Sequence, residues 1–244
     1  MKPALAAIAR NIAQHGHHVY VVSGSASPRF AYTVGLVETL GHELVLAGAA
    51  PYSADQVHRA LNEIAAHLGA GAARDAPVDL GPLGTFSLRG VSDAWVRELM
   101  LGALDYYPGR DLPALQVVPD VDHLTIDVPR LDVPWSAATE PAWRFSFEPW
   151  PHAIPRRSVA ATHTAVLRGA AVIRAARWED DLWELFACPS SEVSRDDLCV
   201  VPLGVLLGAH ASLGPVVDLA IGEGLRREDG AGAFEPWRGA GEEE

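Results

Sequence analysis

The sequence predicts an α+β protein in which a mixed or antiparallel sheet with packed helices is followed by a second, smaller α+β domain. Hydrophobic residues make up 49% of the 244 residues and charged residues 20%, a composition typical of globular proteins rather than of disordered chains. Short segments with strand patterns and segments with helical spacing also follow one another along the chain. A proline-rich stretch divides these segments into two groups, which predicts two parts.

The first part begins with an expected amphipathic helix and a hairpin. Apolar residues recur at helical spacing from Leu5 to Ile12 in an alanine-rich stretch, and Gly16 ends it. Two runs rich in β-branched and aromatic residues follow at 18–23 and 30–37. Because only a short turn-forming segment separates them, the two runs predict a β-hairpin.

The remainder of the first part alternates between the two kinds of element. A third short strand is expected at 43–47, and Ser53 is a suitable N-cap for a helix whose apolar face runs from Val57 to Leu68. The further expected elements are a strand at 84–91, a helix at 94–107 and a strand at 115–118. This order favours one sheet with helices packed on it.

Proline and tryptophan are dense in residues 121–155, and proline at this density interrupts regular structure. We therefore expect an N-terminal α+β domain at 1–120, an arm or linker at 121–155 and a small C-terminal α+β domain at 156–228. The elements expected in the small domain are a helical segment at 162–168, strands at 171–177 and 182–187, and a helix at 200–209. Residues 229–244 are rich in glycine and end in acidic residues, which predicts a disordered acidic tail.

The charge of the chain excludes some classes of partner. The formal net charge is −12, from 31 acidic against 19 basic residues. Nucleic-acid interfaces depend on Lys and Arg that neutralise phosphates, so a nucleic-acid partner is not expected, and neither is an anionic membrane surface. No apolar run reaches the roughly 18–20 residues of a membrane-spanning helix. Polar residues interrupt the N-terminal segment before a signal-peptide core develops, so we expect a cytoplasmic protein.

Several segments of the first part carry a family resemblance. They are His15-Gly16, the string Phe30-Ala31-Tyr32-Thr33-Val34-Gly35-Leu36, Gly41-His42-Glu43-Leu44 and the run from Leu115 to Asp120. Together they resemble the bacterial domain-of-unknown-function family 4262, over roughly residues 5–150. More weakly, residues 181–185 and 213–227 resemble small bacterial domains found among toxin-immunity proteins. Neither resemblance implies a known reaction.

The glycine at position 35 points to a candidate ligand site. Glycine inside a strand weakens it and marks a bulge or a close approach by a ligand or another backbone. Thr33 and Gly35 share one face of the expected strand, so a ligand could reach a hydroxyl and backbone groups there; the alternative is a bulge that curves the sheet. The expected ligand-binding residues are Tyr32, Thr33, Gly35, His42, Gln116 and Asp120.

The histidines near the N-terminus form a second candidate site. His15 and His17 could share a metal ion with His42 or Asp120, and the segment Asp120-Val121-Asp122-His123 offers another group of ligand types. The alternative is a helix-to-strand connection with solvated histidines, because alternation along an extended chain puts His17 and His18 on opposite faces.

Three classes of function remain open at this point. The favoured class is a ligand-binding or protein-binding protein of the interaction or immunity type, without complete catalytic machinery. The second is a flavin-dependent oxidoreductase, because a hairpin, a third strand and a helix resemble the flavin-binding split barrels. The third is a metal-assisted hydrolase that uses the N-terminal histidines. Cys188 and Cys199 lack the close spacing of zinc or thioredoxin motifs and are expected to fill core space.

Overall fold

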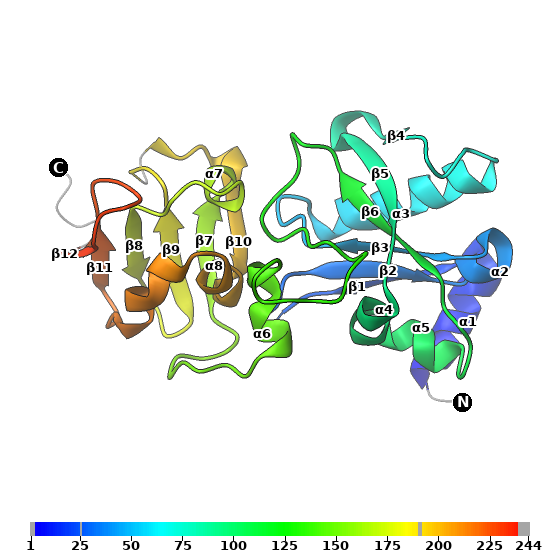
Figure 1. The fold of residues 1–244 in the computed structure, drawn as a ribbon, viewed down its shortest axis with the longest axis horizontal. Helices are drawn as coiled ribbons and strands as arrows, with labels where there is room; N and C mark the ends of the chain where they lie inside the picture. Colours follow the sequence, from blue (N-terminus) through cyan, green and yellow to red (C-terminus); the bar gives the residue numbers. More distant parts are fainter. Residues whose placement is uncertain (1–2, 25, 190–191, 239–244) are drawn as a thin grey trace. The chain divides into compact units, whose positions relative to one another are not determined.

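The computed structural model describes residues 3–24, 26–189 and 192–238. The chain divides into two compact units (Figure 1). The N-terminal unit consists of Met1–Val22, Arg29–Leu124 and Val128–Ser136. The C-terminal unit consists of Ser23–Pro28, Thr125–Asp127 and Ala137–Glu244. Each unit contains a mixed sheet with helices, which confirms the α+β class.

The N-terminal unit is built on a six-stranded sheet with the order β1-β2-β3-β6-β5-β4. Only β3 and β6 pair in parallel among these neighbours, and the other pairs are antiparallel. Its strands are β1 (His18–Val22), β2 (Phe30–Val34), β3 (Glu43–Ala47), β4 (Val78–Asp79), β5 (Thr85–Gly90) and β6 (Ala114–Pro119). Its helices are α1 (Pro3–His15), α2 (Leu36–Leu40), α3 (Ala54–Gly69), η1 (Gly81–Leu83), α4 (Asp93–Leu99) and α5 (Leu101–Tyr106). The predicted hairpin is confirmed as β1 and β2.

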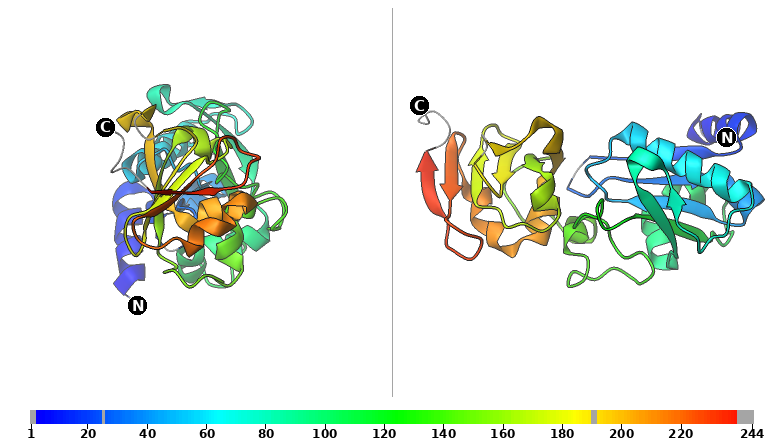
Figure 2. Two further views of the ribbon diagram at one scale, coloured as in Figure 1. Left: turned by 90° about the vertical axis from the view of Figure 1, so that its left-hand side faces the viewer. Right: turned by 90° about the horizontal axis from the view of Figure 1, so that it is seen from above.

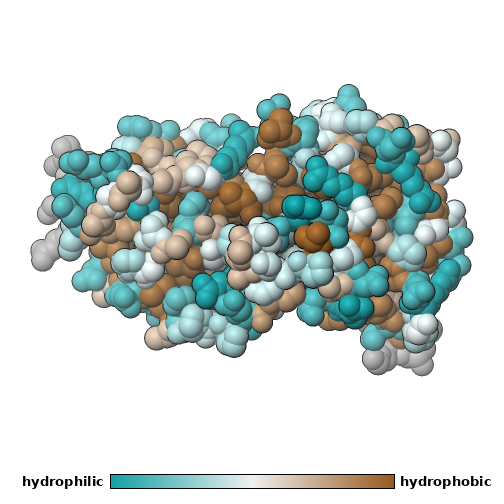
Figure 3. All heavy atoms as spheres, in the orientation of Figure 1, coloured by the Kyte–Doolittle hydropathy of each residue, from teal (hydrophilic) through white to brown (hydrophobic). Residues whose placement is uncertain are grey.

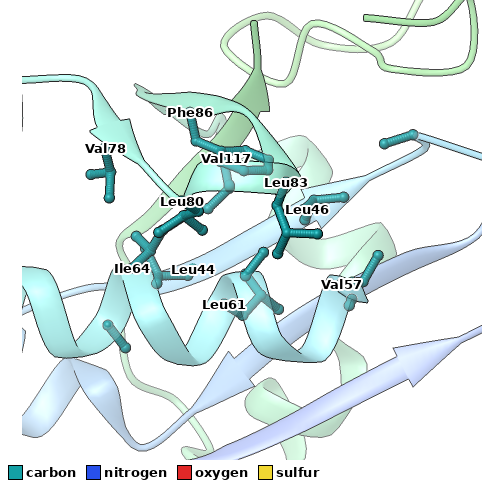
Figure 4. Close-up of a cluster of buried hydrophobic side chains, with 14 of the residues drawn as sticks. Leu44, Leu46, Val57, Leu61, Ile64, Val78, Leu80, Leu83, Phe86 and Val117 are labelled. Atoms are coloured by element: carbon teal, nitrogen blue, oxygen red, sulfur yellow. The ribbon is translucent and has the colours of Figure 1, made fainter. Parts of the chain in front are cut away.

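Helix α3 covers one face of this sheet, and α4 and α5 lie on the other (Figures 1 and 2). The helix begins at a capping box, in which Ser53 Oγ accepts from the Gln56 backbone N–H and the Gln56 side chain accepts from Ser53 N–H. Its apolar face, with Leu61 and Ile64, packs toward Leu44 on β3 (Figure 4). This burial of apolar side chains is the main source of stability in the unit.

The C-terminal unit is built on a second six-stranded sheet with the order β10-β7-β9-β8-β11-β12. Its strands are β7 (Val159–His163), β8 (Arg174–Arg177), β9 (Leu182–Phe186), β10 (Leu198–Pro202), β11 (Glu223–Arg226) and β12 (Glu235–Arg238). Strands β7 and β9 pair in parallel, and the other neighbours are antiparallel. Its helices are η2 (Pro141–Trp143), α6 (Arg144–Phe147), α7 (Thr164–Leu167), η4 (Arg195–Asp197), α8 (Leu203–Ala209) and η5 (Ala211–Asp218).

Within the proline-rich segment, residues 128–136 belong to the N-terminal unit and residues 137–155 to the C-terminal one. Trp143 is buried and donates its indole N–H to the Asp127 backbone oxygen at 2.9 Å. The expected tail also differs, since Glu235–Arg238 forms β12 against β11. Residues 239–244 lie outside the described residues.

Three element boundaries differ from expectation for local reasons. The strand expected at 30–37 ends at Val34, because Gly35 leads into helix α2. The single helix expected at 94–107 is two helices, α4 and α5, with Met100 in a non-helical conformation between them. The helix expected from residue 200 begins at Leu203, because residues 198–202 pair with β7 instead.

Two properties of the whole chain bear on function. On the face drawn in Figure 3, hydrophilic and apolar residues are interspersed over both units. Among the described residues, no helix combines the length and the apolar character needed to cross a membrane.

Candidate functional site

A polar pocket of about 660 Å³ opens on the N-terminal unit. We call it the histidine pocket; it is lined by Asn11, His15, His17, His18, Val19, His58 and Asn62. Helix α1, the turn after it, strand β1 and helix α3 each supply part of this lining. Three of the four histidines come from one short stretch of sequence, because α1 ends at His15 and Gly16, with φ +84°, turns the chain into β1.

Amide side chains hold three of the imidazole rings in place. His17 Nε2 lies 2.8 Å from Asn62 Oδ1, and Asn62 Nδ2 lies 3.0 Å from His58 Nδ1. Asn11 Nδ2 lies 2.7 Å from His18 Nδ1. Since an amide nitrogen only donates and an amide oxygen only accepts, His17 donates through Nε2, whereas His58 and His18 accept at Nδ1. The neutral forms of His18 and His58 then carry their proton on Nε2 and offer it as a donor.

Histidines are the ionisable side chains among the described residues that line this pocket. Among the described residues that line it, none is acidic and none is Lys or Arg. Burial lowers the pKa of His18, and the neighbouring His58 and His17 lower it further. His18 is therefore neutral at neutral pH.

A buried network supports the turn that carries His17. The Glu43 side chain is 0% exposed, and its carboxylate accepts from the Thr33 hydroxyl at 2.6 Å and from the Gly35 N–H at 2.8 Å. The N–H of Val37 also donates to it, at 3.2 Å, so the carboxylate satisfies the first N–H groups of α2. Thr33 Oγ1 in turn accepts from the Leu44 N–H at 2.8 Å.

Gly35 belongs to the hydrogen-bond network of Glu43 and also lies against the turn that carries His17 of the histidine pocket. Its φ is +120°, and a Cβ at this position would lie 3.0 Å from Ile12 Cγ1 and 3.1 Å from both Gly16 O and His17 Cα. The absence of a side chain thus lets the turn from α1 to β1 pass directly over α2. Thr33 and Gly35 therefore do not line the histidine pocket themselves but help to position His17, which does.

The other residues predicted to bind a ligand are engaged within the unit. Tyr32 Oη accepts from Gly102 N–H at 2.9 Å. Gln116 donates to Pro129 O at 2.7 Å and accepts from the N–H of Leu131 at 3.2 Å. Neither residue is among the lining of the histidine pocket, so direct ligand contact by Tyr32 and Gln116 stays a prediction.

Asp120 and His42 lie at two further positions in the same unit. The Asp120 carboxylate accepts from Thr85 N–H at 2.7 Å and lies 2.7 Å from His123 Nδ1. Burial raises the pKa of Asp120, but the bonds from Thr85 and His123 outweigh it and hold the pKa below its usual value. His42 is buried and its Nδ1 donates to Leu40 O at 2.9 Å, while its Nε2 has no hydrogen-bond partner among the described residues.

The proposed metal ligands are only partly brought together. His15 and His17 both line the histidine pocket, and His42 is not among its residues. Within 3–24, 26–189 and 192–238, no three His, Cys, Asp or Glu residues are arranged so that they could hold a metal ion. Sequence reasoning missed Asn11, His58 and Asn62. His58 and Asn62 are four residues apart on α3, so their shared helix face was a usable signal.

Comparisons with known proteins support one assignment. None of the curated proteins and none of the solved structures compared with the chain matches it. The model of one family does match, and the matched segment includes every residue that lines the histidine pocket. Residues 11–124 match the family described as Domain of unknown function (DUF4262), which confirms the resemblance of the N-terminal part to that family.

Proposed function

We propose that this chain is a binding protein whose N-terminal unit takes up a small ligand with an anionic group in the histidine pocket. The observation that carries the proposal is the lining, which offers imidazoles and amides and no carboxylate among its described residues. An imidazole is either neutral or positively charged, so this lining favours a neutral or anionic molecule over a cationic one. The ring and amide N–H groups are suitable donors to a carboxylate or phosphate oxygen.

The size and polarity of the pocket support a small, hydrogen-bonding ligand. Its volume of about 660 Å³ lies within the range of roughly 300–1,000 Å³ that is usual for small-molecule pockets. Most such pockets are lined mainly by apolar side chains, whereas Val19 is the apolar residue among those described here. A polar ligand can satisfy the imidazole and amide groups that an apolar ligand would leave without partners.

Binding of simple anions to the intact chain tests this proposal. Inorganic phosphate and acetate are titrated by calorimetry at about pH 6 and about pH 8, on either side of the ordinary histidine pKa. We expect tighter binding at the lower pH, because a protonated imidazole attracts an anion more strongly than a neutral one. Metal binding would have the opposite pH dependence, since a histidine must be neutral to bind a metal ion.

A matched pair of variants on helix α3 locates the binding. His58→Gln removes an imidazole from the histidine pocket, and His67→Gln removes an exposed one from the same helix outside that pocket. We expect H58Q to weaken anion binding and H67Q to leave it unchanged. Equal affinities of the two variants would place any anion binding elsewhere, and absence of binding to both anions at both pH values would contradict the proposal.

A second candidate function is recognition of a protein partner by the C-terminal unit. Strand β10 is at the edge of its sheet, and Leu198 and Val200 on one of its faces are 45% and 68% exposed. An exposed edge strand with apolar side chains is suited to pairing with an extended peptide. Selection from a displayed peptide library should yield extended apolar peptides, and Val200→Lys should abolish their binding.

A flavin or a metal ion bound to the purified protein would distinguish the two catalytic alternatives from these proposals. A flavin-dependent oxidoreductase predicts a flavin absorbance band that is released on denaturation. A metal-assisted hydrolase predicts zinc, iron or manganese in near-equal amount to the protein by elemental analysis. The arrangement of described residues supports neither alternative over binding.

A further inference from the structure

The C-terminal unit brings Cys188 next to His163 at one edge of its sheet. Strand β7 ends at His163, and its parallel neighbour β9 ends at Phe186, two residues before Cys188. Parallel neighbours end at the same edge, so the two side chains meet there although they are distant in sequence. Cys188 Sγ lies 3.9 Å from His163 Nε2, within reach of a weak S–H···N hydrogen bond.

His163 is a buried ring rather than a solvated one. Its side chain is 8% exposed, and its Nδ1 has no hydrogen-bond partner among the described residues. Strand β10 runs antiparallel to β7 with Leu198 opposite His163, which brings the preceding Asp197 to the same edge. The ends of β7 and β9 and the start of β10 thus place a thiol, an imidazole and a carboxylate at one edge of the sheet.

We propose that Cys188 is a reactive thiol, with His163 as its base, that forms mixed disulfides with low-molecular-weight disulfides. In this step the Cys188 S–H proton moves to His163 Nε2 as the sulfur attacks one sulfur of the small disulfide. A new S–S bond forms, the old S–S bond breaks, and the departing thiolate takes the proton from His163. One protein thiol is thus oxidised to a mixed disulfide while one small thiol is released.

The pKa shifts of Cys188 and His163 favour a neutral thiol and a neutral imidazole before the reaction, so the proton is transferred during the attack rather than beforehand. Burial raises the pKa of Cys188, Glu192 raises it further, and Arg174 opposes them. Burial lowers the pKa of His163, and the nearby Asp197 opposes this in part. Both groups are therefore uncharged at neutral pH, which leaves the imidazole nitrogen available as an acceptor.

The second cysteine of the same unit provides an internal comparison. Cys199 lies on β10, and its sulfur is 3.8 Å from the backbone oxygen of Asp197. A carbonyl oxygen is a poor proton acceptor compared with an imidazole nitrogen. The proposal therefore predicts different rates for two cysteines that are both partly exposed.

The test follows mixed-disulfide formation with oxidised glutathione by intact-protein mass spectrometry. Cys199→Ser leaves Cys188 as the reporter, and Cys188→Ser leaves Cys199. We expect Cys188 to react at least about tenfold faster near neutral pH, a modest part of what general base catalysis supplies. Adding His163→Gln to the C199S chain should reduce the Cys188 rate to that of Cys199. Equal rates for the two single-cysteine chains would overturn the proposal.

The pH profile distinguishes a base from a structural role and does not depend on the His163 variant. In the C199S chain we expect the rate to rise as His163 loses its proton, below the ordinary histidine pKa of about 6.5, and then to level off. A rate that rises only in the alkaline range, where the thiol itself ionises, would overturn the role of His163. In the H163Q variant of the C188S chain, an unchanged Cys199 rate confirms that the sheet edge is intact.

Discussion

At the scale of single residues, the structure explains why position 35 is a glycine, a question that the sequence alone left open. A glycine inside an apparent strand suggested either a bulge or a close approach of another group. The structure shows a close approach, by Gly16 and His17, at a position with φ +120°. The side chain is missing because another part of the backbone passes there, and this requirement is not visible in a local pattern.

Substitution of Gly35 tests this explanation. Gly35→Ala should lower the free energy of unfolding by about 1–3 kcal/mol, because alanine at a left-handed position is strained and its Cβ meets the turn that carries His17. Urea unfolding measures the loss. Gly69→Ala is the control, since Gly69 ends α3 with no atom within 4 Å of an added Cβ. A G35A variant as stable as G69A would contradict the tight approach.

The hydroxyl of Thr33 makes a second residue-scale prediction. Thr33→Val removes the donor to the buried Glu43 carboxylate and the acceptor for the Leu44 N–H. Buried groups left without partners cost about 1–3 kcal/mol each, so thermal unfolding of T33V should begin at a clearly lower temperature. Thr33→Ser keeps the hydroxyl and should lose less stability than T33V. Equal losses would mean that the methyl group, and not the hydrogen bonds, holds this position.

At the scale of elements, helix α3 was predictable and α2 was not. Helix α3 has a capping residue and a long apolar face, and both signals are local. Helix α2 spans only Leu36–Leu40 and is held by the carboxylate of Glu43, which follows it in the sequence. In the same way β10 and β12 exist because neighbouring strands pair with them, so their own residues predict them poorly. Of the candidate site, the sequence indicated His15 and His17 but not the partners on α3.

The capping box of α3 predicts a measurable difference between two serines. Ser53→Ala removes a side-chain oxygen that accepts from Gln56 N–H, and it should lower the free energy of unfolding by about 1 kcal/mol. Ser92 occupies the same position before α4 but makes no capping hydrogen bond. Ser92→Ala should therefore cost less in the same denaturant titration. A larger loss for S92A than for S53A would show that capping is not what stabilises α3.

At the scale of the whole molecule, both units contain histidines whose pKa is lowered first of all by burial. They are His18, His42, His152, His163 and His210. In the unfolded chain such rings take up a proton near pH 6.5, whereas in the folded chain they resist it. Below that pH the unfolded state therefore binds more protons than the folded state, and stability falls as the pH is lowered.

We expect the midpoint of thermal unfolding to be lower at about pH 5.5 than at about pH 7.5, because this interval covers the loss caused by the histidines. The carboxylates of Asp120, Asp132 and Asp229 also have lowered pKa values, but their contribution is lost only as the pH falls through about 3.8 and below. The same scan in added salt checks that a change in net repulsion is not the cause. His18→Gln should reduce the difference between the two pH values, because it removes one of the rings whose pKa is lowered by burial. An unchanged or higher midpoint at the lower pH would mean that burial of these rings does not oppose their protonation, and the neutral state assigned to His18 at neutral pH would be wrong.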